Sequence, residues 1–218
     1  MFSKKDKADF TMQTHAYIEQ LLQRHPALAV CADSINAFYN ELSAVFKRDN
    51  RAYLCGNGGS ASDAEHWAGE LLKGFYLKRP LNAEQLAGFP DDTGKRLQDA
   101  LPAIPLLGFT ALRSAVANDM AGDLDYAQLT WALGRPGDAL IGISTSGNAG
   151  NVNYAASAAK ARKMKVLGMT GQGGGKLAQA ADICIKVPAS KTHEIQEYHL
   201  AIYHALCLAI EEDFFGQR

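Results

Sequence analysis

Five short apolar runs, separated by stretches of helical character, constrain the fold of this chain more than any other feature. Most of the runs are nearly continuous in apolar character, as expected of strands in a parallel sheet that is covered on both faces. They read RAYLCG from Arg51, AIPLLG from Ala103, DALIGIS from Asp138, KVLGMT from Lys165 and DICIKV from Asp182. Strands that alternate with helices predict βαβ units and a three-layer α/β sandwich.

Helical segments are predicted on both sides of these runs. Residues Thr11 to Lys47 indicate two helices with a break near Pro26, a residue that suits a helix start. The segment from Lys191 to Phe215 is apolar nearly all the way round. Such a helix is buried, and we expect a subunit interface as the place of its burial.

The length of 218 residues predicts one sizeable core and a single domain over residues 1–218, with an N-terminal helical segment over 1–50. Between Leu81 and Leu101 the chain is polar and contains a Pro-Asp-Asp-Thr-Gly turn. We interpret this stretch, residues 81–101, as a surface insertion or a lid.

Charge and cysteine content argue against several classes of function. The net charge is -1 and the pI is about 6.6, so the sequence lacks the basic character typical of nucleic-acid binding and no nucleic-acid partner is expected. It contains neither a membrane span nor a secretory signal, which predicts a cytoplasmic protein without a membrane partner. The four cysteines form no CxxC pair and are expected to be reduced thiols in apolar segments.

A glycine-rich loop follows the first apolar run. Gly56, Gly58 and Ala61 match the G-x-G-x-x-A spacing of a dinucleotide site, but the region about 20 residues later, FYLKRPL, has no acidic residue to bind a ribose. Backbone amides at a helix N-terminus together with the Ser60 hydroxyl can instead bind a phosphate. A tight turn that simply requires glycine is the structural alternative.

A second loop of the same kind favours the phosphate interpretation. The stretch ISTSGNAG, from Ile143, again joins a strand to a helix and places three hydroxyl residues at the junction. Two such loops at the carboxyl ends of strands predict a shared anion site in the crevice where α/β sheets bind ligands. A third glycine cluster, TGQGGGKL from Thr170, lacks the features of a P-loop and is interpreted as a strand-to-helix turn.

Five motifs of this chain resemble, in order, those of the phosphoheptose isomerases, members of the sugar isomerase (SIS) domain family. They are CGNGGSASDAEHWAGEL from Cys55, VANDMAGDLDYA from Val116, GDALIGISTSGNAGNV from Gly137, LGMTGQGGGKLAQAADICIKVP from Leu167 and EIQEYHLAIYHAL from Glu194. The resemblance implies a three-layer αβα sandwich with a five-stranded parallel sheet and a homotetramer. The implied reaction converts sedoheptulose 7-phosphate to a D-glycero-D-manno-heptose 7-phosphate for bacterial heptose synthesis.

The resemblance also implies a set of site residues. A divalent metal, usually zinc, would be held by residues matching His66, Glu70, Gln196 and His204. Catalytic acid and base roles fall on Glu70 and His204. The implied contacts to the sugar phosphate are Asn57, Gly58, Gly59, Ser60, Glu70, Asn118, Asp119, Ser144, Thr145, Ser146 and Gln196.

The residue types suit that chemistry. Aldose-ketose exchange moves a proton between adjacent carbons through an enediolate, so it needs a base and a group that stabilises the oxyanion. A carboxylate, an imidazole and a Lewis-acid metal can supply both. His66 and Glu70, at i and i+4, lie on one face of the helix that begins at the first loop. A solvated helical pair is the alternative.

The spacing of Gln196 and His204 makes it harder to explain how both could bind the same metal ion. Eight residues of helix separate their Cα atoms by about 12 Å. Either the side chains lean together, or the helix is irregular near Gln196, or a second subunit completes the site. His199, beside this pair, is interpreted as a packed or interface histidine.

Some positions depart from the family pattern. Ala149 stands where a serine is usual, Gly74, next to Lys73, where an arginine is common, and His193 where an aspartate is usual. These differences leave open an isomerase that acts on a different sugar phosphate. A non-catalytic SIS-domain protein that binds a partner, such as the replication initiator, is a further alternative. The relative of that kind lacks the full His, Glu, Gln, His set, which this chain retains.

Overall fold

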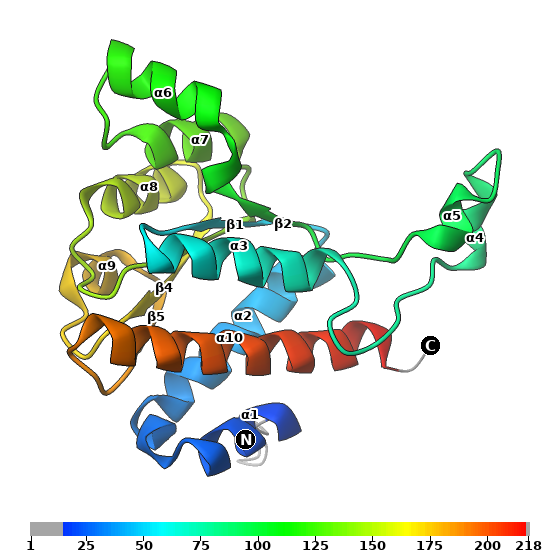
Figure 1. Ribbon diagram of the computed structural model, residues 1–218, viewed down its shortest axis with the longest axis horizontal. Coiled ribbons are helices and arrows are strands. Elements are labelled where there is room, and N and C mark those ends of the chain that lie inside the picture. Colours follow the sequence, from blue (N-terminus) through cyan, green and yellow to red (C-terminus); the bar gives the residue numbers. More distant parts are fainter. Residues whose placement is uncertain (1–14, 217–218) are drawn as a thin grey trace, which may run out of the picture.

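All five predicted strands form one parallel sheet in the order β2-β1-β3-β4-β5 (Figure 1). The structure is a computed structural model and describes residues 15–216. The strands are β1 (Ala52–Cys55), β2 (Ala103–Pro105), β3 (Ala139–Ile143), β4 (Lys165–Thr170) and β5 (Ile183–Lys186). The register pairs Ala52 with both Ala103 and Ala139, so β1 lies between β2 and β3.

This strand order creates the position of a ligand site. The chain passes from β1 to β2 on one side and then crosses to β3 on the other side of β1. The carboxyl ends of β1 and β3 therefore flank a topological switch point, where open α/β sheets bind their ligands. Both hydroxyl- and glycine-rich loops begin at these two strand ends.

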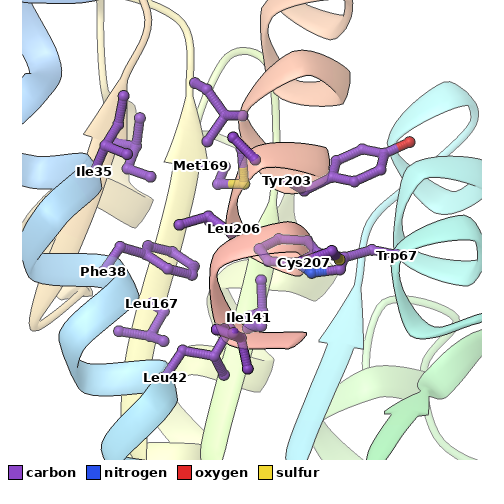
Figure 2. Close-up of a cluster of buried hydrophobic side chains, with 14 of the residues drawn as sticks. Ile35, Phe38, Leu42, Trp67, Ile141, Leu167, Met169, Tyr203, Leu206 and Cys207 are labelled. Carbon is purple, nitrogen blue, oxygen red and sulfur yellow. The ribbon is translucent and has the colours of Figure 1, made fainter. Parts of the chain in front are cut away.

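Helices cover both faces of the sheet, which confirms the three-layer αβα prediction. On one face α2 (Ala32–Lys47), α3 (Gly59–Leu72) and α10 (Thr192–Phe215) pack against the inward side chains of the strands. On the other face lie α7 (Asp125–Leu133), α8 (Gly150–Ala161) and α9 (Gly175–Ala180). Figure 2 shows the first core, where Phe38, Trp67 and Leu206 come together from three different helices.

The helix α3 carries the first loop into this core. Its buried residues Ala64, Trp67, Ala68 and Leu71 follow the i, i+3, i+4, i+7 pattern of a helix with one apolar stripe. This stripe fixes the rotation of α3 against the sheet. His66 and Glu70 therefore lie beside the stripe, at the edge of the core.

The N-terminal helices confirm the predicted break at Pro26. The first helix is α1 (Ala16–Arg24), and Pro26 begins the 3-10 helix η1 (Pro26–Cys31) that leads into α2. The predicted start at Thr11 lies outside the described residues. Because α1, α2 and α3 all pack against α10, one chain alone accounts for much of the apolar surface of that helix. The all-round apolar pattern therefore does not itself require a subunit interface.

Residues 81–101, the predicted insertion or lid, form an arm that projects from the rest of the molecule (Figure 1). The arm contains the short helices α4 (Ala83–Ala87) and α5 (Thr93–Arg96). Its two ends are joined by an antiparallel bridge between Pro80 and Gln98 and by a hydrogen bond of 2.6 Å from the Asp99 amide to the Arg79 carbonyl.

The remaining helical elements lie between β2 and α7. They are η2 (Leu106–Gly108) and α6 (Thr110–Asp119), which packs on α7. All four cysteines are free thiols, and three of them are buried, as predicted. Among the described residues no helix is both long and apolar enough to cross a bilayer.

Candidate functional site

A polar cavity lies between the loops that follow β1 and β3. Its lining includes Asn57 and Ser60 from the first loop and Ser144, Thr145 and Ser146 from the second. Ser60 and Ser144 are buried, while their neighbours reach solvent. The structure thus brings together the hydroxyl residues that the sequence predicted from two separate segments. Ala149, the departure from the family pattern, also lines this cavity.

Backbone geometry explains the glycines of these loops. A side chain at Gly56 would bring its Cβ within 2.5 Å of the Ser60 carbonyl oxygen, so the turn into α3 closes only with glycine. Gly58 has φ of +55°, in the left-handed region where glycine is favoured. The amides of Ser60 and Ala61 already donate to the Asn57 and Gly58 carbonyls. The turn still places the N-terminus of α3 beside the cavity, where the helix dipole favours a bound anion.

The third glycine cluster supports the second loop, a role that the sequence did not indicate. A Cβ at Gly147 would lie 2.0 Å from the Gly174 carbonyl oxygen, so the two backbones approach too closely for side chains. The Leu177 amide donates to the Gly147 carbonyl at 2.9 Å, and the Lys176 amide donates to Asn148 Oδ1 at 3.2 Å. The cluster is a strand-to-helix turn, as predicted, and it also fixes the conformation of the second loop.

Two asparagines join the first and second loops directly. Asn57 Nδ2 donates to Asn151 Oδ1 at 2.8 Å, and Asn151 Nδ2 donates back to Asn57 Oδ1 at 3.0 Å. Asn57, a predicted substrate contact, therefore lines the cavity with its amide already paired. Asn151 was not predicted, although a polar residue in the first turn of the helix after a hydroxyl loop was the available signal.

His66, Glu70 and His204 come together where α3 packs on α10. His66 Nε2 lies 3.1 Å from Glu70 Oε1, and the ring centroids of His66 and His204 are 5.1 Å apart. Lys73 Nζ lies 3.6 Å from Glu70 Oε2. Glu70 is largely buried, at 15% side-chain exposure, whereas His66 is half exposed. A carboxylate and two imidazoles thus share one small region beyond the polar cavity between the loops.

His204 combines a lowered pKa with a ring nitrogen that has no partner in the described part of the chain. Burial and the neighbouring His66 lower its pKa, although Glu70 acts in the opposite direction. Its Nε2 atom is buried and, among the described residues, has no hydrogen-bond partner. An unpartnered buried nitrogen of this kind is suited to accept a proton or to bind a metal ion.

Gln196 lies apart from these three residues. Its side chain packs against Gly59 at the start of α3, where an added Cβ would lie 2.4 Å from Gln196 Nε2. The helix α10 is regular from Thr192 to Phe215, so an irregular helix near Gln196 is not the explanation of the long spacing. Within one chain the structure does not gather all four predicted metal ligands.

The fit of a metal ion therefore rests on three residues. In the part of the chain that the structure describes, no three His, Cys, Asp or Glu side chains are already arranged as a metal-binding group. Two imidazoles and one carboxylate are nevertheless a ligand set that zinc accepts, and the unpartnered His204 Nε2 adjoins the His66–Glu70 pair. By the chemistry of its donors the region suits a divalent ion.

Asn118 and Asp119 are not brought to this region. They end α6, where Asn118 Nδ2 donates to Asp119 Oδ1 at 2.7 Å, and neither residue lines the cavity between the loops. Asp119 lines a separate apolar depression with Leu112, Val116 and Met120. Within one described chain, Asn118 and Asp119 therefore lie away from the cavity between the loops.

Behind His66 lies a pair of residues that the sequence reasoning missed. The Tyr203 hydroxyl lies 2.8 Å from His66 Nδ1, and Asp63 is nearby with a buried Oδ2 atom that has no hydrogen-bond partner among the described residues. Burial raises the pKa of Asp63 to about 6, and burial together with Asp63 raises the pKa of Tyr203. The i, i+3 spacing of Asp63 and His66 was a signal, but the part of Tyr203 depends on how α10 packs on α3.

The comparison with protein families agrees with this geometry. The model of the SIS domain matches residues 16–171, which is more than half of the chain. The chain is a member of the SIS domain family. Among its relatives, the phosphoheptose isomerase of Rhodospirillum rubrum is 38% identical over 185 residues, covering 85% of this chain and 88% of the relative. That of Thiobacillus denitrificans is 43% identical over 165 residues, or 74% of each chain.

Solved structures of relatives share the same architecture. The phosphoheptose isomerase GmhA from Neisseria gonorrhoeae aligns with a TM-score of 0.71 at 31% identity, covering 90% of this chain and 96% of the other. The phosphoheptose isomerase from Francisella tularensis aligns with a TM-score of 0.74 at 30% identity, covering 90% and 95%. This SIS-domain chain therefore matches phosphoheptose isomerases in sequence over most of its length and in fold over 90% of it.

Proposed function

We propose that this protein is an aldose-ketose isomerase that converts sedoheptulose 7-phosphate to a D-glycero-D-manno-heptose 7-phosphate. The observation that carries the proposal is the position of two sites along α3. The phosphate cavity lies at the N-terminus of the helix, and the His66–Glu70 pair lies on the same helix beyond it. Ser60 and Glu70 are ten residues apart, about 15 Å along the helix axis. An extended sugar phosphate suits two sites placed in this way.

In this proposal the two loops hold the phosphate group. The N-terminus of α3 and the hydroxyls of Ser60, Ser144 and Thr145 border it from two directions. The loss of one hydroxyl at Ala149 leaves this set otherwise complete. The phosphate end thereby orients the carbonyl end of the sugar toward Glu70.

Glu70 is the proposed base that removes the proton from the carbon next to the carbonyl. His204, held neutral by its surroundings, moves protons between the sugar oxygens. His66, Glu70 and His204 would hold a divalent ion, usually zinc in this family, and Gln196 is its predicted fourth ligand. Such an ion supplies Lewis-acid stabilisation of the enediolate charge.

The proposed assembly is a homotetramer in the cytoplasm. Gln196, Asn118 and Asp119 are the predicted site residues that one chain leaves away from the centre, and a neighbouring subunit offers a way to complete it. The exposed apolar residues Leu112 and Met120 beside Asp119 are consistent with such a contact.

Incubation of the purified protein with sedoheptulose 7-phosphate, followed by NMR, tests the function. We expect an aldoheptose phosphate to form. Formation of an aldose only from another ketose phosphate would support the alternative substrate. Absence of turnover with every sugar phosphate, together with retained binding, would favour the non-catalytic alternative, against which the close grouping of His66, Glu70 and His204 argues.

A further inference from the structure

We propose that Tyr203, supported by Asp63, is a positioning residue that holds the ring proton of His66 on Nδ1 and so leaves the Nε2 lone pair free for a metal ion. The inference deepens the proposed function and rests on it for the identity of the site. Neither Tyr203 nor Asp63 belongs to the predicted ligand or substrate set. Their role follows from the contacts around His66.

The Tyr203 ring is held in place on several sides. It stacks on Trp67 with ring centroids 5.5 Å apart and planes 15° apart. It meets His66 and His204 edge to face, at centroid distances of 5.6 Å and 4.9 Å. Because this buried ring cannot easily turn away, its hydroxyl stays 2.8 Å from His66 Nδ1.

The acceptor on the other side of the hydroxyl sets the direction of the hydrogen bonds. An ionised carboxylate only accepts, and a tyrosine hydroxyl has one proton to donate. Asp63 Oδ2 is buried and has no hydrogen-bond partner among the described residues, and burial, followed by the Asp63 carboxylate, raises the pKa of Tyr203. We infer that this carboxylate is the acceptor toward which the Tyr203 hydroxyl directs its proton. The Tyr203 oxygen is then left to accept a proton from His66 Nδ1.

Glu70 competes for the same ring proton. His66 Nε2 lies 3.1 Å from Glu70 Oε1, so a proton on Nε2 would form a hydrogen bond with that carboxylate. In the tautomer with the proton on Nε2, both His66 Nε2 and Glu70 Oε1 would be engaged in that hydrogen bond and unable to bind a metal ion. Tyr203 opposes it by favouring the proton on Nδ1, which directs the Nε2 lone pair to the same place as the carboxylate. Histidine ligands are commonly oriented by a partner on their second nitrogen in this way.

Tyr203→Phe tests the proposal, because it removes the hydroxyl and keeps the stacked ring. Zinc affinity is measured by competition with a chromophoric chelator, and we expect a loss of about 10- to 100-fold. The His66 tautomer is read in metal-free protein from long-range proton-nitrogen NMR correlations at about pH 8.5, where an ordinary imidazole is neutral. We expect Nδ1–H in the wild type and Nε2–H in the variant.

Tyr198→Phe is the matched control on the same helix, since Tyr198 is partly buried and its ring contacts His25 instead of the site. It should leave both readouts unchanged. Asp63→Asn provides a second test if Tyr203→Phe does not fold. Its amide can donate to the Tyr203 oxygen, so the hydroxyl can turn toward His66 and the proton should move to Nε2.

Zinc affinity and the tautomer do not depend on turnover. A protein inactive on heptose phosphates that still lost zinc affinity in Tyr203→Phe would refute the proposed function and support this inference. Unchanged zinc affinity and an unchanged His66 tautomer in folded Tyr203→Phe would overturn the inference. The absence of zinc binding in the wild type would overturn it as well.

Discussion

Two histidines of α10, His199 and His204, differ in role because their immediate neighbours differ. His204 borders His66 and Glu70, whereas His199 is fully buried and faces the end of β4, with Nε2 3.4 Å from the Thr170 carbonyl oxygen. Burial lowers the pKa of His199 to about 4, and the hydrogen bond with Thr170 opposes this only in part. His199 is therefore a neutral packed residue, as the sequence indicated.

This burial predicts a pH dependence of stability. The ordinary histidine pKa is about 6.5, so between about pH 6.5 and pH 4 the unfolded chain binds the proton and the folded chain does not. The contribution of neutral His199 to the free energy of unfolding is fully present above pH 6.5. About 3 kcal/mol of this contribution is lost on acidification to pH 4. The free energies of unfolding of the wild type and of His199→Gln are measured with urea at fixed protein concentration. The difference between these two free energies should become smaller as the pH falls from about 6.5 to about 4. A difference independent of pH would contradict the burial of a neutral His199.

The sequence predicted site residues that lie within one short segment, but not contacts between residues from distant segments. The hydroxyl loops and the His66–Glu70 spacing were visible because each lies within one short segment. The amide pair of Asn57 and Asn151 joins residues 94 positions apart and required the strand order. Tyr203 was not visible, because its hydroxyl reaches His66 only through the packing of two helices.

At the scale of elements, the strands were predictable because burial on both faces leaves nearly continuous apolar runs. The helix α10 was predictable from its apolar residues on all sides, but the helices that pack against it were not. The helix α1 covers it within the same chain, and pattern alone cannot distinguish that contact from a subunit interface. The role of the third glycine cluster likewise depended on a backbone contact between two loops.

A buried ion pair fastens the end of α10 to the base of the projecting arm. Glu211 accepts from Arg79 Nε at 2.8 Å and from the amides of Phe75, Tyr76 and Leu77. Arg79 also donates to the carbonyl oxygens of Glu70 and Leu71 at the end of α3. Both side chains of the pair are almost fully buried, at 0% and 1% exposure.

Glu211→Gln should therefore destabilise the protein by about 3–5 kcal/mol, since it leaves a buried guanidinium without its counter-charge. Glu212→Gln is the matched control, because Glu212 is the exposed neighbour on the same helix. Denaturant unfolding measures the free energy of unfolding of both variants, and that of Glu212→Gln should be close to that of the wild type. Equal stability of the two variants would show that the Arg79–Glu211 pair does not hold this junction.

At the scale of the whole molecule, one chain presents the polar cavity between the loops and three candidate metal ligands. It does not bring Gln196, Asn118 or Asp119 to the same centre. We therefore predict that the protein is a homotetramer in solution. Light scattering at micromolar concentration should give about four times the mass of one chain. A monomer mass together with full activity would mean that one chain completes the site through a movement within itself.

The central claim is that Glu70 removes the proton from the sugar carbon. The direct measurement is deuterium incorporation in deuterium oxide, comparing the wild type with Glu70→Gln at equal zinc content. Glu65→Gln is the control, because Glu65 is exposed on the same helix. Wild type and Glu65→Gln should introduce deuterium at the carbon next to the carbonyl, while Glu70→Gln should exchange at least ~10²-fold more slowly. Undiminished exchange in Glu70→Gln would contradict the claim and assign the base to another group.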